Sequence, residues 1–220
     1  MIVTIDGPAG AGKSTTAREL AARLGFQFLD TGAMYRAVTW FCLREHVDLQ
    51  DEKAVAAAAR RGQFVFESGR VLVDGVDVTR EIRRSSVTDQ TRFIAGNNSV
   101  REHLVALQRQ LAAGQNVVTE GRDQGTVAFP QAECKFFLTA SPLMRALRRQ
   151  HDLALNGEEV ALEELLSQQE GRDQRDERRQ YGALKPAADA ISIDTSEMSF
   201  DDVVTQMANM VQQKRQPAPK

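Results

Sequence analysis

The sequence predicts an α/β fold in which one five-stranded parallel sheet is covered by helices on both faces. Five short apolar runs are typical of buried parallel strands, at residues 2–5, 26–29, 116–119, 135–139 and 190–193. Helical patterns lie between or after these runs, and this alternation favours a parallel sheet. A glycine-rich segment directly follows the first run. The 220 residues suit one such domain carrying small lobes.

Capping and breaking residues predict where the helices of this fold begin and end. Apolar residues recur at helical spacing over residues 17–24, and Gly25 then ends the pattern. Ser141 is a predicted N-cap, with Pro142 at the first helical position, where its missing N–H costs nothing. Ser199 opens a segment that resembles a capping box before the last amphipathic helix.

One region departs from the alternation of strands and helices. Three short apolar runs joined by two tight turns predict a small antiparallel meander, inserted at about residues 62–84. A polar, charge-dense segment at about 150–171 is the candidate for a mobile lid, with Gly157 and Gly171 as flexible points. The ending at about 212–220 has two prolines and no apolar pattern, which predicts a disordered tail. We expect residues 1–220 to form a single domain.

The overall composition excludes several classes of protein. The formal charge of -2 indicates no general attraction to nucleic acid or membranes, and no apolar stretch is long enough to span a bilayer. Cys42 and Cys134 form no CxxC pair, which favours structural thiols in a reducing compartment. The first apolar run follows Met1 directly, without a leader pattern, so we expect a cytoplasmic protein.

The basic residues are strongly biased towards arginine. Of the 28 basic residues only six are Lys, which leaves 22 Arg. The planar guanidinium grips phosphate and carboxylate with two hydrogen bonds, whereas Lys acts as a point charge. The bias therefore suits a protein that binds phosphates, although a GC-rich genome would produce the same bias without any functional cause.

The strongest functional signal is the glycine-rich segment, which matches G-x-x-x-x-G-K-[ST] between a predicted strand and a predicted helix. The motif consists of Gly7, Pro8, Ala9, Gly10, Ala11, Gly12, Lys13 and Ser14, and Thr15 follows it. Glycines let backbone N–H groups surround an anion, and the helix directs its positive end at the phosphates. We expect these residues to bind ATP, with Lys13 on the β- and γ-phosphates and the Ser14 hydroxyl on Mg²⁺.

The motif alone leaves the reaction open. Guanine-nucleotide switches resemble one another in an Asn-Lys-x-Asp segment that reads guanine, and this sequence contains no such segment. A guanine-nucleotide switch is therefore strongly disfavoured. An ATP- or GTP-dependent switch or accessory module remains an alternative to a phosphotransferase.

Three further segments are candidates for a second anion site, which a kinase needs for its acceptor. Residues 30–36 (DTGAMYR) follow the second predicted strand and residues 120–127 (EGRDQGTV) follow the third. Both lie at carboxyl ends of parallel strands, where open α/β sheets bind ligands. Residues 172–179 (RDQRDERR), if helical, place Arg172, Asp176 and Arg179 on one stripe. The alternative for this last run is a solvated, salt-bridged helix face.

Several segments follow one another along the chain in this order: the glycine-rich loop, DTGAMYR, the β insertion, EGRDQGTVAFP, LTAS, RDQRDERR and AADAISIDTS. Taken together, they make the sequence resemble bacterial cytidylate kinases from residue 1 to about residue 211. The resemblance implies the P-loop fold of nucleoside monophosphate kinases, with a monophosphate-binding lobe at about 31–110. It implies transfer of the γ-phosphoryl group of ATP to CMP or dCMP with Mg²⁺. It also implies small-molecule substrates only, and we expect a monomer.

The resemblance assigns roles to particular residues. Those implied to bind the acceptor phosphate are Arg36, Arg122 and Arg179. The residues implied to be catalytic are Lys13, Arg122 and Arg179. Those implied to contact the ribose are Arg172 and Asp176. Those implied to read the cytosine edge are Arg101 and Asp123, and Thr31 falls near the acceptor nucleotide. The candidates for lid contacts to ATP phosphates are Arg145, Arg148 and Arg149, of which we select Arg149 as the predicted cofactor contact.

The sequence departs from the family pattern at one position. Related enzymes usually place a Ser beside the cytosine amino group, where this chain has Arg92. Thr88 and Thr91 are nearby and could substitute if the register shifts, whereas an Arg cannot accept a hydrogen bond from an amino group. The residue that accepts from the cytosine amino group is therefore left open between Thr88 and Thr91.

A phosphate acceptor needs no general base, since the second pKa of a phosphate monoester is about 6 and the group is mostly dianionic at neutral pH. We therefore do not assign Asp123 or Asp176 as a base. The alternatives within the same fold are kinases of UMP, shikimate or another small alcohol, and an alcohol acceptor would call for a base.

Overall fold

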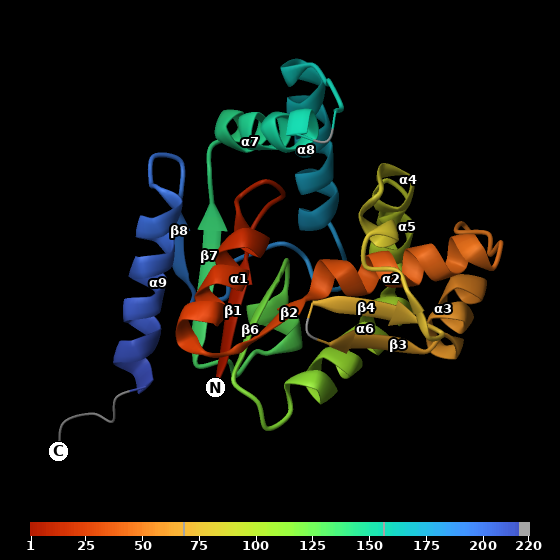
Figure 1. The fold of residues 1–220 in the computed structure, drawn as a ribbon, viewed down its shortest axis with the longest axis horizontal. Coiled ribbons are helices and arrows are strands. Elements are labelled where there is room, and N and C mark those ends of the chain that lie inside the picture. Colours follow the sequence, from red (N-terminus) through yellow and green to blue (C-terminus); the bar gives the residue numbers. More distant parts are fainter. Residues whose placement is uncertain (68, 156, 216–220) are drawn as a thin grey trace. The chain divides into compact units, whose positions relative to one another are not determined.

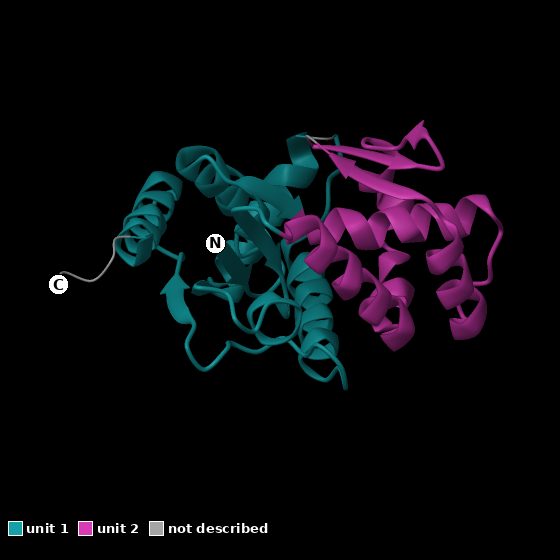
Figure 2. Cartoon of the chain, turned by 90° about the horizontal axis from the view of Figure 1, so that it is seen from below, with its two compact units in different colours: residues 1–29, 114–220 teal, residues 30–113 magenta. Residues whose placement is uncertain are grey.

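The computed structural model describes residues 1–67, 69–155 and 157–215. The chain forms two compact units, which are coloured separately in Figure 2. Unit 1 consists of residues 1–29 together with the chain from residue 114 onward, and unit 2 consists of residues 30–113. The bounds of unit 2 lie within three residues of the range predicted for the monophosphate-binding lobe.

Unit 1 is built on a five-stranded sheet in the order β2-β6-β1-β7-β8 (Figure 1). The strands are β1 (Ile2–Asp6), β2 (Gln27–Asp30), β6 (Val117–Gly121), β7 (Cys134–Thr139) and β8 (Ile191–Asp194). The central strand β1 pairs in parallel with both β6 and β7, and β7 pairs in parallel with β8. All five predicted strands are present within two residues of their expected bounds, and the predicted α/β fold is confirmed.

The two faces of this sheet differ in chemistry. Helices α1 (Lys13–Leu24) and α9 (Phe200–Arg215) pack on one face, where Leu20 and Met207 are fully buried in one hydrophobic core with Phe136 of β7. A π-helical turn, η2 (Gln124–Ala128), lies against β1 and β6. The side chains around it are polar and buried, and they belong to the candidate site described below.

The predicted helix caps are confirmed. The Ser141 hydroxyl accepts a 3.3 Å hydrogen bond from the backbone N–H of Met144, and α7 (Pro142–Leu155) begins as expected. The Ser199 hydroxyl accepts from the N–H of Asp202 at 3.2 Å and donates to the Asp202 carboxylate at 2.6 Å. Helix α9 continues to Arg215, beyond the expected start of the tail, and residues 216–220 of that predicted tail lie outside the described residues.

Helix α8 (Leu162–Glu177) follows α7 and contains the C-terminal part of the segment that was predicted as a lid. Gly171, expected to be a flexible point, lies inside α8, so the helix continues through it. Gly157 has a φ of 79°, a backbone conformation that suits glycine at the connection between the two helices. No helix of the described residues has the length and apolar character needed to cross a membrane.

Unit 2 combines helices with the predicted meander. Its elements are α2 (Thr31–Arg44), α3 (Glu52–Arg61), β3 (Phe64–Glu67), β4 (Arg70–Val73), β5 (Val76–Asp77), a short 3-10 turn η1 (Glu81–Arg83), α4 (Ser85–Thr88), α5 (Thr91–Gly96) and α6 (Asn98–Ala112). Strands β3, β4 and β5 pair antiparallel in that order, so the β insertion is confirmed. Asp74 and Gly75 both have positive φ at the second turn, as a tight hairpin requires.

Candidate active site

The glycine-rich loop joins β1 to α1 and lies where the motif predicts it. Gly7, Gly10 and Gly12 have φ values of 148°, 76° and 85°, which L side chains rarely adopt. A Cβ atom on Gly7 would lie 2.0 Å from the carbonyl oxygen of Leu138. Helix α1 starts at Lys13 without a side-chain cap, as expected of a helix N-terminus that binds an anion.

Replacing Gly7 with alanine is expected to cost more than about 3 kcal/mol of unfolding free energy, because the backbone strain adds to a clash with Leu138. The matched control is Gly25→Ala, where φ is also positive (67°) but nothing lies within 4 Å of the added Cβ. That variant should lose only about 1 kcal/mol. Urea unfolding of both variants measures this, and equal losses would contradict a clash between residue 7 and Leu138.

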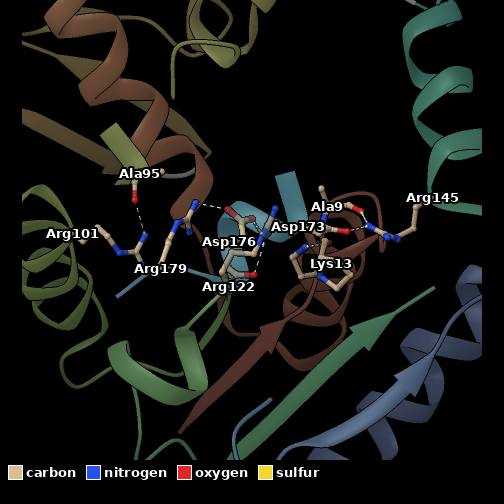
Figure 3. A network of polar contacts seen from close by, with 11 residues as sticks. Ala9, Lys13, Ala95, Arg101, Arg122, Arg145, Asp173, Asp176 and Arg179 are labelled. Atoms are coloured by element: carbon tan, nitrogen blue, oxygen red, sulfur yellow. Dashed lines mark hydrogen bonds and ion pairs between the residues drawn. The ribbon is translucent and has the colours of Figure 1, made fainter. Parts of the chain in front are cut away.

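Lys13 is buried at the start of α1, with an exposed fraction of 5%. Its ammonium group donates a 2.6 Å hydrogen bond to the carbonyl oxygen of Pro8 in the loop (Figure 3). Burial and the nearby guanidinium groups of Arg122 and Arg172 lower the pKa of Lys13 well below its usual value. This concentration of positive charge in a buried place is what a polyanion would neutralise.

The side chains of Ser14 and Glu120 bring oxygen atoms that can bind a metal ion together beside the loop. The Ser14 hydroxyl donates a 3.0 Å hydrogen bond to the carboxylate of Glu120, which lies near the end of β6. Within the described residues, no group of three or more His, Cys, Asp or Glu side chains forms a cage for a metal ion. Mg²⁺ is usually held by one or two protein oxygens together with substrate phosphates, so this pair fits it. Glu120 was not predicted as a metal-site residue.

A cluster of charged side chains connects the end of β6 to α8 (Figure 3). Asp176 is 3% exposed and accepts a 2.8 Å hydrogen bond from Nε of Arg122 and another from Arg179. Burial alone would raise the pKa of Asp176, but Arg122, Arg179 and Arg172 together hold it below its usual value. The carboxylate therefore stays ionised and orients the arginines.

The structure corrects one detail of the prediction that Arg172, Asp176 and Arg179 share one helical stripe. Helix α8 ends at Glu177, so Arg172 and Asp176 lie in the helix, whereas Arg179 lies in the segment after it. The three residues are therefore not one helical stripe. They are nevertheless brought together, because the chain beyond the helix keeps Arg179 within hydrogen-bonding reach of Asp176.

The three arginines of α7 have different surroundings. Nη1 of the buried Arg145 donates to the carbonyl oxygen of Ala9 at 2.9 Å and to the carboxylate of Asp173 at 2.5 Å. Arg148 donates to the hydroxyl and carbonyl oxygens of Thr195 at 3.0 and 2.6 Å. Arg149, the predicted cofactor contact, is exposed. Arg145 thus hydrogen-bonds to the loop, and the role of Arg149 stays a prediction.

Asp6 was not singled out from the sequence, although it directly precedes the loop. Its side chain is 3% exposed and accepts hydrogen bonds from the backbone N–H groups of Gln124 and Gly125 at 2.8 and 2.7 Å. Burial raises the pKa of Asp6 to about 6, with Asp123 adding to the increase, while the two amides and Lys13 oppose it. An acidic residue at the end of a buried strand was the only sequence signal for it.

The raised pKa predicts how stability depends on pH. Between about pH 4 and pH 6 the folded protein binds this proton more tightly than the unfolded chain, so stability decreases as the pH rises through this window. The shift from 3.8 to about 6 corresponds to about 3 kcal/mol. The unfolding free energy of wild type minus that of Asp6→Asn should fall by this amount between pH 3 and pH 7. Urea unfolding across this range measures it, and a constant difference would contradict the raised pKa.

Asp30 organises the first candidate residues of unit 2. It is the N-cap of α2, and its carboxylate accepts from the N–H of Ala33 at 2.8 Å. The same carboxylate contacts Arg36 at 3.4 Å and Arg83 of η1 at 3.1 Å. Thr31 is the buried first residue of α2. The sequence predicted Thr31 and Arg36, but the association of Arg83 with them depends on the tertiary fold.

Arg101 is buried on α6 with an exposed fraction of 2%. It donates a 3.2 Å hydrogen bond to the carbonyl oxygen of Ala95, and its guanidinium lies 5.7 Å from the ring centroid of Tyr35. A buried arginine placed in this way is suited to reading a polar edge. Its proposed partner Asp123 belongs to unit 1, where it precedes η2 and is 4% exposed.

The departure at Arg92 has a clear structural context. Arg92 is exposed and lies over the ring of Phe93 at 4.9 Å, so its charge does not enter the interior of unit 2. The Thr91 hydroxyl donates to the carbonyl oxygen of Val87 at 2.9 Å and accepts from Thr39 at 3.2 Å. Thr88 is half-buried at the end of α4. Of the two threonines considered as substitutes, Thr91 is already engaged within unit 2.

The sequence is similar to those of known proteins over nearly its whole length. The family model for cytidylate kinase matches residues 3–213. The chain is 47% identical to a cytidylate kinase of Rhodopirellula baltica, over 97% of this chain and 93% of that one. It is 46% identical to a cytidylate kinase of Caldanaerobacter subterraneus subsp. tengcongensis, over 92% and 90% of the two chains.

Among solved structures, an uncharacterized protein from Eubacterium ventriosum aligns with a TM-score of 0.50 over 96% of this chain and 98% of that one. Since its sequence is only 11% identical, that likeness concerns the fold alone. The sequence relatives and the family model cover nearly the whole chain, and the site residues lie within the matched range. The chain belongs to the cytidylate kinase family.

Proposed function

We propose that this protein transfers the γ-phosphoryl group of ATP to CMP or dCMP, forming ADP and CDP or dCDP. Membership of the cytidylate kinase family supports the reaction. The structural observation that carries the proposal is the combination, within unit 1, of a glycine-rich phosphate loop and the arginine–carboxylate cluster of Arg122, Asp176 and Arg179. One reaction with two phosphate-bearing substrates explains both features.

The acceptor needs alignment and charge neutralisation rather than activation, because its phosphate is already a nucleophile at neutral pH. Lys13 and the loop amides would bind the β- and γ-phosphates, and Arg122 and Arg179 would bind the acceptor phosphate together with Arg36. Positive groups that are already in place stabilise the charge that develops on the transferred group. Asp176 orients the arginines and does not act as a base.

The proposed metal site consists of the Ser14 hydroxyl with Glu120 beside it. Bound there, Mg²⁺ would neutralise charge on the ATP phosphates. The Glu120 carboxylate would hold the Ser14 side chain in orientation.

We assign the recognition of cytosine to Arg101 and Asp123, and contact with the ribose to Arg172 and Asp176. Cytosine presents an amino donor beside a ring-nitrogen acceptor, which an acid and an arginine complement, whereas uracil reverses this pattern. Thr88 and Thr91 remain the two hydroxyls proposed to accept from the amino group. These assignments rest on the match to the family motifs.

The polar segment at about 150–171 is the proposed lid, which would exclude water while both substrates are bound. The bonds from Arg145 to Ala9 and Asp173 connect α7 and α8 to the loop and support a lid that responds to the nucleotide. We also propose that the enzyme is a monomer acting on small molecules alone. Size-exclusion chromatography with light scattering tests the oligomeric state.

The test of the reaction is product identification. Purified protein is incubated with γ-labelled ATP, a magnesium salt and CMP, and the labelled products are separated by chromatography. Label in CDP supports the proposal. Label in inorganic phosphate alone, at a slow rate that a protein partner increases, would favour a switch. Transfer to shikimate or another alcohol, but to no monophosphate, would favour a kinase of another acceptor.

A further inference from the structure

The carboxylate of Asp6 has no part in the mechanism proposed above, yet it is among the most buried charged groups of unit 1. Burying a carboxylate is costly unless strong hydrogen bonds compensate. Asp6 receives two, both from backbone N–H groups more than one hundred residues away along the chain. Asp6 is also the last residue of β1, so Gly7 of the phosphate loop follows it directly.

The two amides bound by Asp6 begin the turn η2, immediately after Arg122 and Asp123. The turn is also held by the N–H of Val127, which donates to the Asp123 carbonyl oxygen at 2.8 Å. The Thr119 hydroxyl donates to the side-chain oxygen of Gln124 at 2.9 Å. The segment that carries Arg122 and Asp123 is thus attached on its C-terminal side to the strand that leads into the loop.

The contact between Asp6 and the turn is close. A Cβ atom on Gly125 would lie 3.0 Å from the Thr4 hydroxyl oxygen, 3.2 Å from Cδ of Lys135 and 3.4 Å from the Asp6 carboxylate. An added Cβ would therefore require these side chains to move by a few tenths of an ångström. The distance between the turn and β1 is therefore set by direct contact.

The charged groups near the Asp6 carboxylate come from three elements. Lys13 of α1 attracts its negative charge, and Asp123 repels it. The stem of Lys135 in β7 packs beside Gly125, while its ammonium group donates to the Pro130 carbonyl oxygen at 2.6 Å and to Asp189 at 2.9 Å. The described bonds of the Asp6 carboxylate are therefore to the two amides and not to a cation.

We propose that Asp6 is a positioning residue, whose carboxylate fixes Arg122 and Asp123 at a set distance from the phosphate loop. The proposal rests on the proposed function, in which Arg122 holds the acceptor phosphate and the loop holds ATP. Phosphoryl transfer requires the attacking oxygen in line with the γ-phosphoryl group, and a misplacement of about 1 Å can cost about 10²-fold in rate. Asp6 thus acts on the rate through the spacing between two binding sites.

The experiment compares Asp6→Asn with wild type. Asparagine has nearly the same shape, but its amide nitrogen cannot accept a hydrogen bond, so one of the two backbone N–H groups loses its acceptor. We expect kcat for CMP to fall by about 10- to 100-fold. The dissociation constants of ADP and of CMP, measured by calorimetry with each nucleotide alone, should change by less than about threefold.

Asp194→Asn is the matched control, because Asp194 also ends a strand of the same sheet and its carboxylate accepts a backbone N–H, from Ser196 at 2.9 Å. Asp194 is exposed and has no part in the proposed mechanism. Kinetics of this variant should stay within about twofold of wild type. Hydrogen exchange at the amides of Gln124 and Gly125 should accelerate in Asp6→Asn and not in Asp194→Asn.

Three outcomes would overturn the proposal. A kcat for Asp6→Asn within about twofold of wild type would remove the rate effect. Weakened ADP binding with kcat retained at saturating ATP would assign Asp6 to the loop alone. A lower kcat with unchanged hydrogen exchange at the amides of Gln124 and Gly125 would show that the rate effect does not depend on the contact of Asp6 with η2.

If Asp6→Asn does not fold, Gly125→Ala replaces it, since the added Cβ shifts the same turn while the carboxylate stays in place. The expected result is again a lower kcat with nearly unchanged binding constants, and an unchanged kcat would overturn the proposal. Failure of the proposed function gives a different result, because wild type would then phosphorylate no monophosphate.

Discussion

Replacing Lys13 with methionine is expected to lower kcat for CMP by a factor on the order of 10³, because the variant loses a buried positive charge that we propose acts on the transferred phosphoryl group. The methionine side chain keeps most of the volume of the lysine stem. Burial already disfavours the charged form of Lys13, so the melting temperature should stay equal or increase. Steady-state kinetics and thermal unfolding measure the two effects.

Lys135→Met is the matched control for this variant. Lys135 is also buried in unit 1, and like Lys13 it donates a 2.6 Å hydrogen bond to the carbonyl oxygen of a proline five residues earlier. Its ammonium group pairs with Asp189 and has no role in the proposed mechanism. We expect a loss of stability with kcat within about threefold of wild type. Equal losses of kcat in both variants would contradict a specific role for Lys13.

Arg122→Ala should have the second largest effect, raising the KM for CMP by about 10-fold or more and lowering kcat by about 10²-fold. The variant removes a proposed donor to the acceptor phosphate and also one of the two arginines that bind Asp176. Arg122→Lys should recover little of this, since an ammonium group cannot reproduce the planar fork of a guanidinium. The KM for ATP should change much less than the KM for CMP.

Arg36→Ala in unit 2 should also raise the KM for CMP, since we propose that Arg36 binds the acceptor phosphate. Arg23→Ala is the control, since Arg23 forms exposed ion pairs with Glu19 and Asp201 that contribute little. Near-normal kinetics in both Arg36→Ala and Arg122→Ala would remove these residues from the acceptor site.

Local patterns predicted the elements of this fold well because each depends on neighbouring residues. The apolar runs, the caps at Ser141 and Ser199 and the turn at Asp74 and Gly75 are all short-range features. The helices of unit 2 were not predicted individually. Gly171, predicted as a flexible point, lies inside α8, because a glycine inside a helix costs only about 1 kcal/mol.

Some features of the candidate site were likewise predicted from local patterns, and others were not. The loop and the motif arginines were found because each motif is continuous in the sequence. The contact of Asp6 with η2, the bond from Arg145 to Asp173 and the pair of Ser14 with Glu120 were not found. Each joins segments far apart in the chain, and one sequence carries no signal for such pairs.

Phosphorylation of a cytidine monophosphate is tested most directly by coupled ADP formation. Wild-type protein is assayed with ATP and a magnesium salt against CMP, dCMP, UMP, AMP and GMP in parallel. We predict strong turnover with CMP and dCMP and weak turnover with UMP. Equal turnover with CMP and UMP would contradict the assignment of Arg101 and Asp123 to the base. Absence of turnover with every monophosphate would contradict the proposed reaction itself.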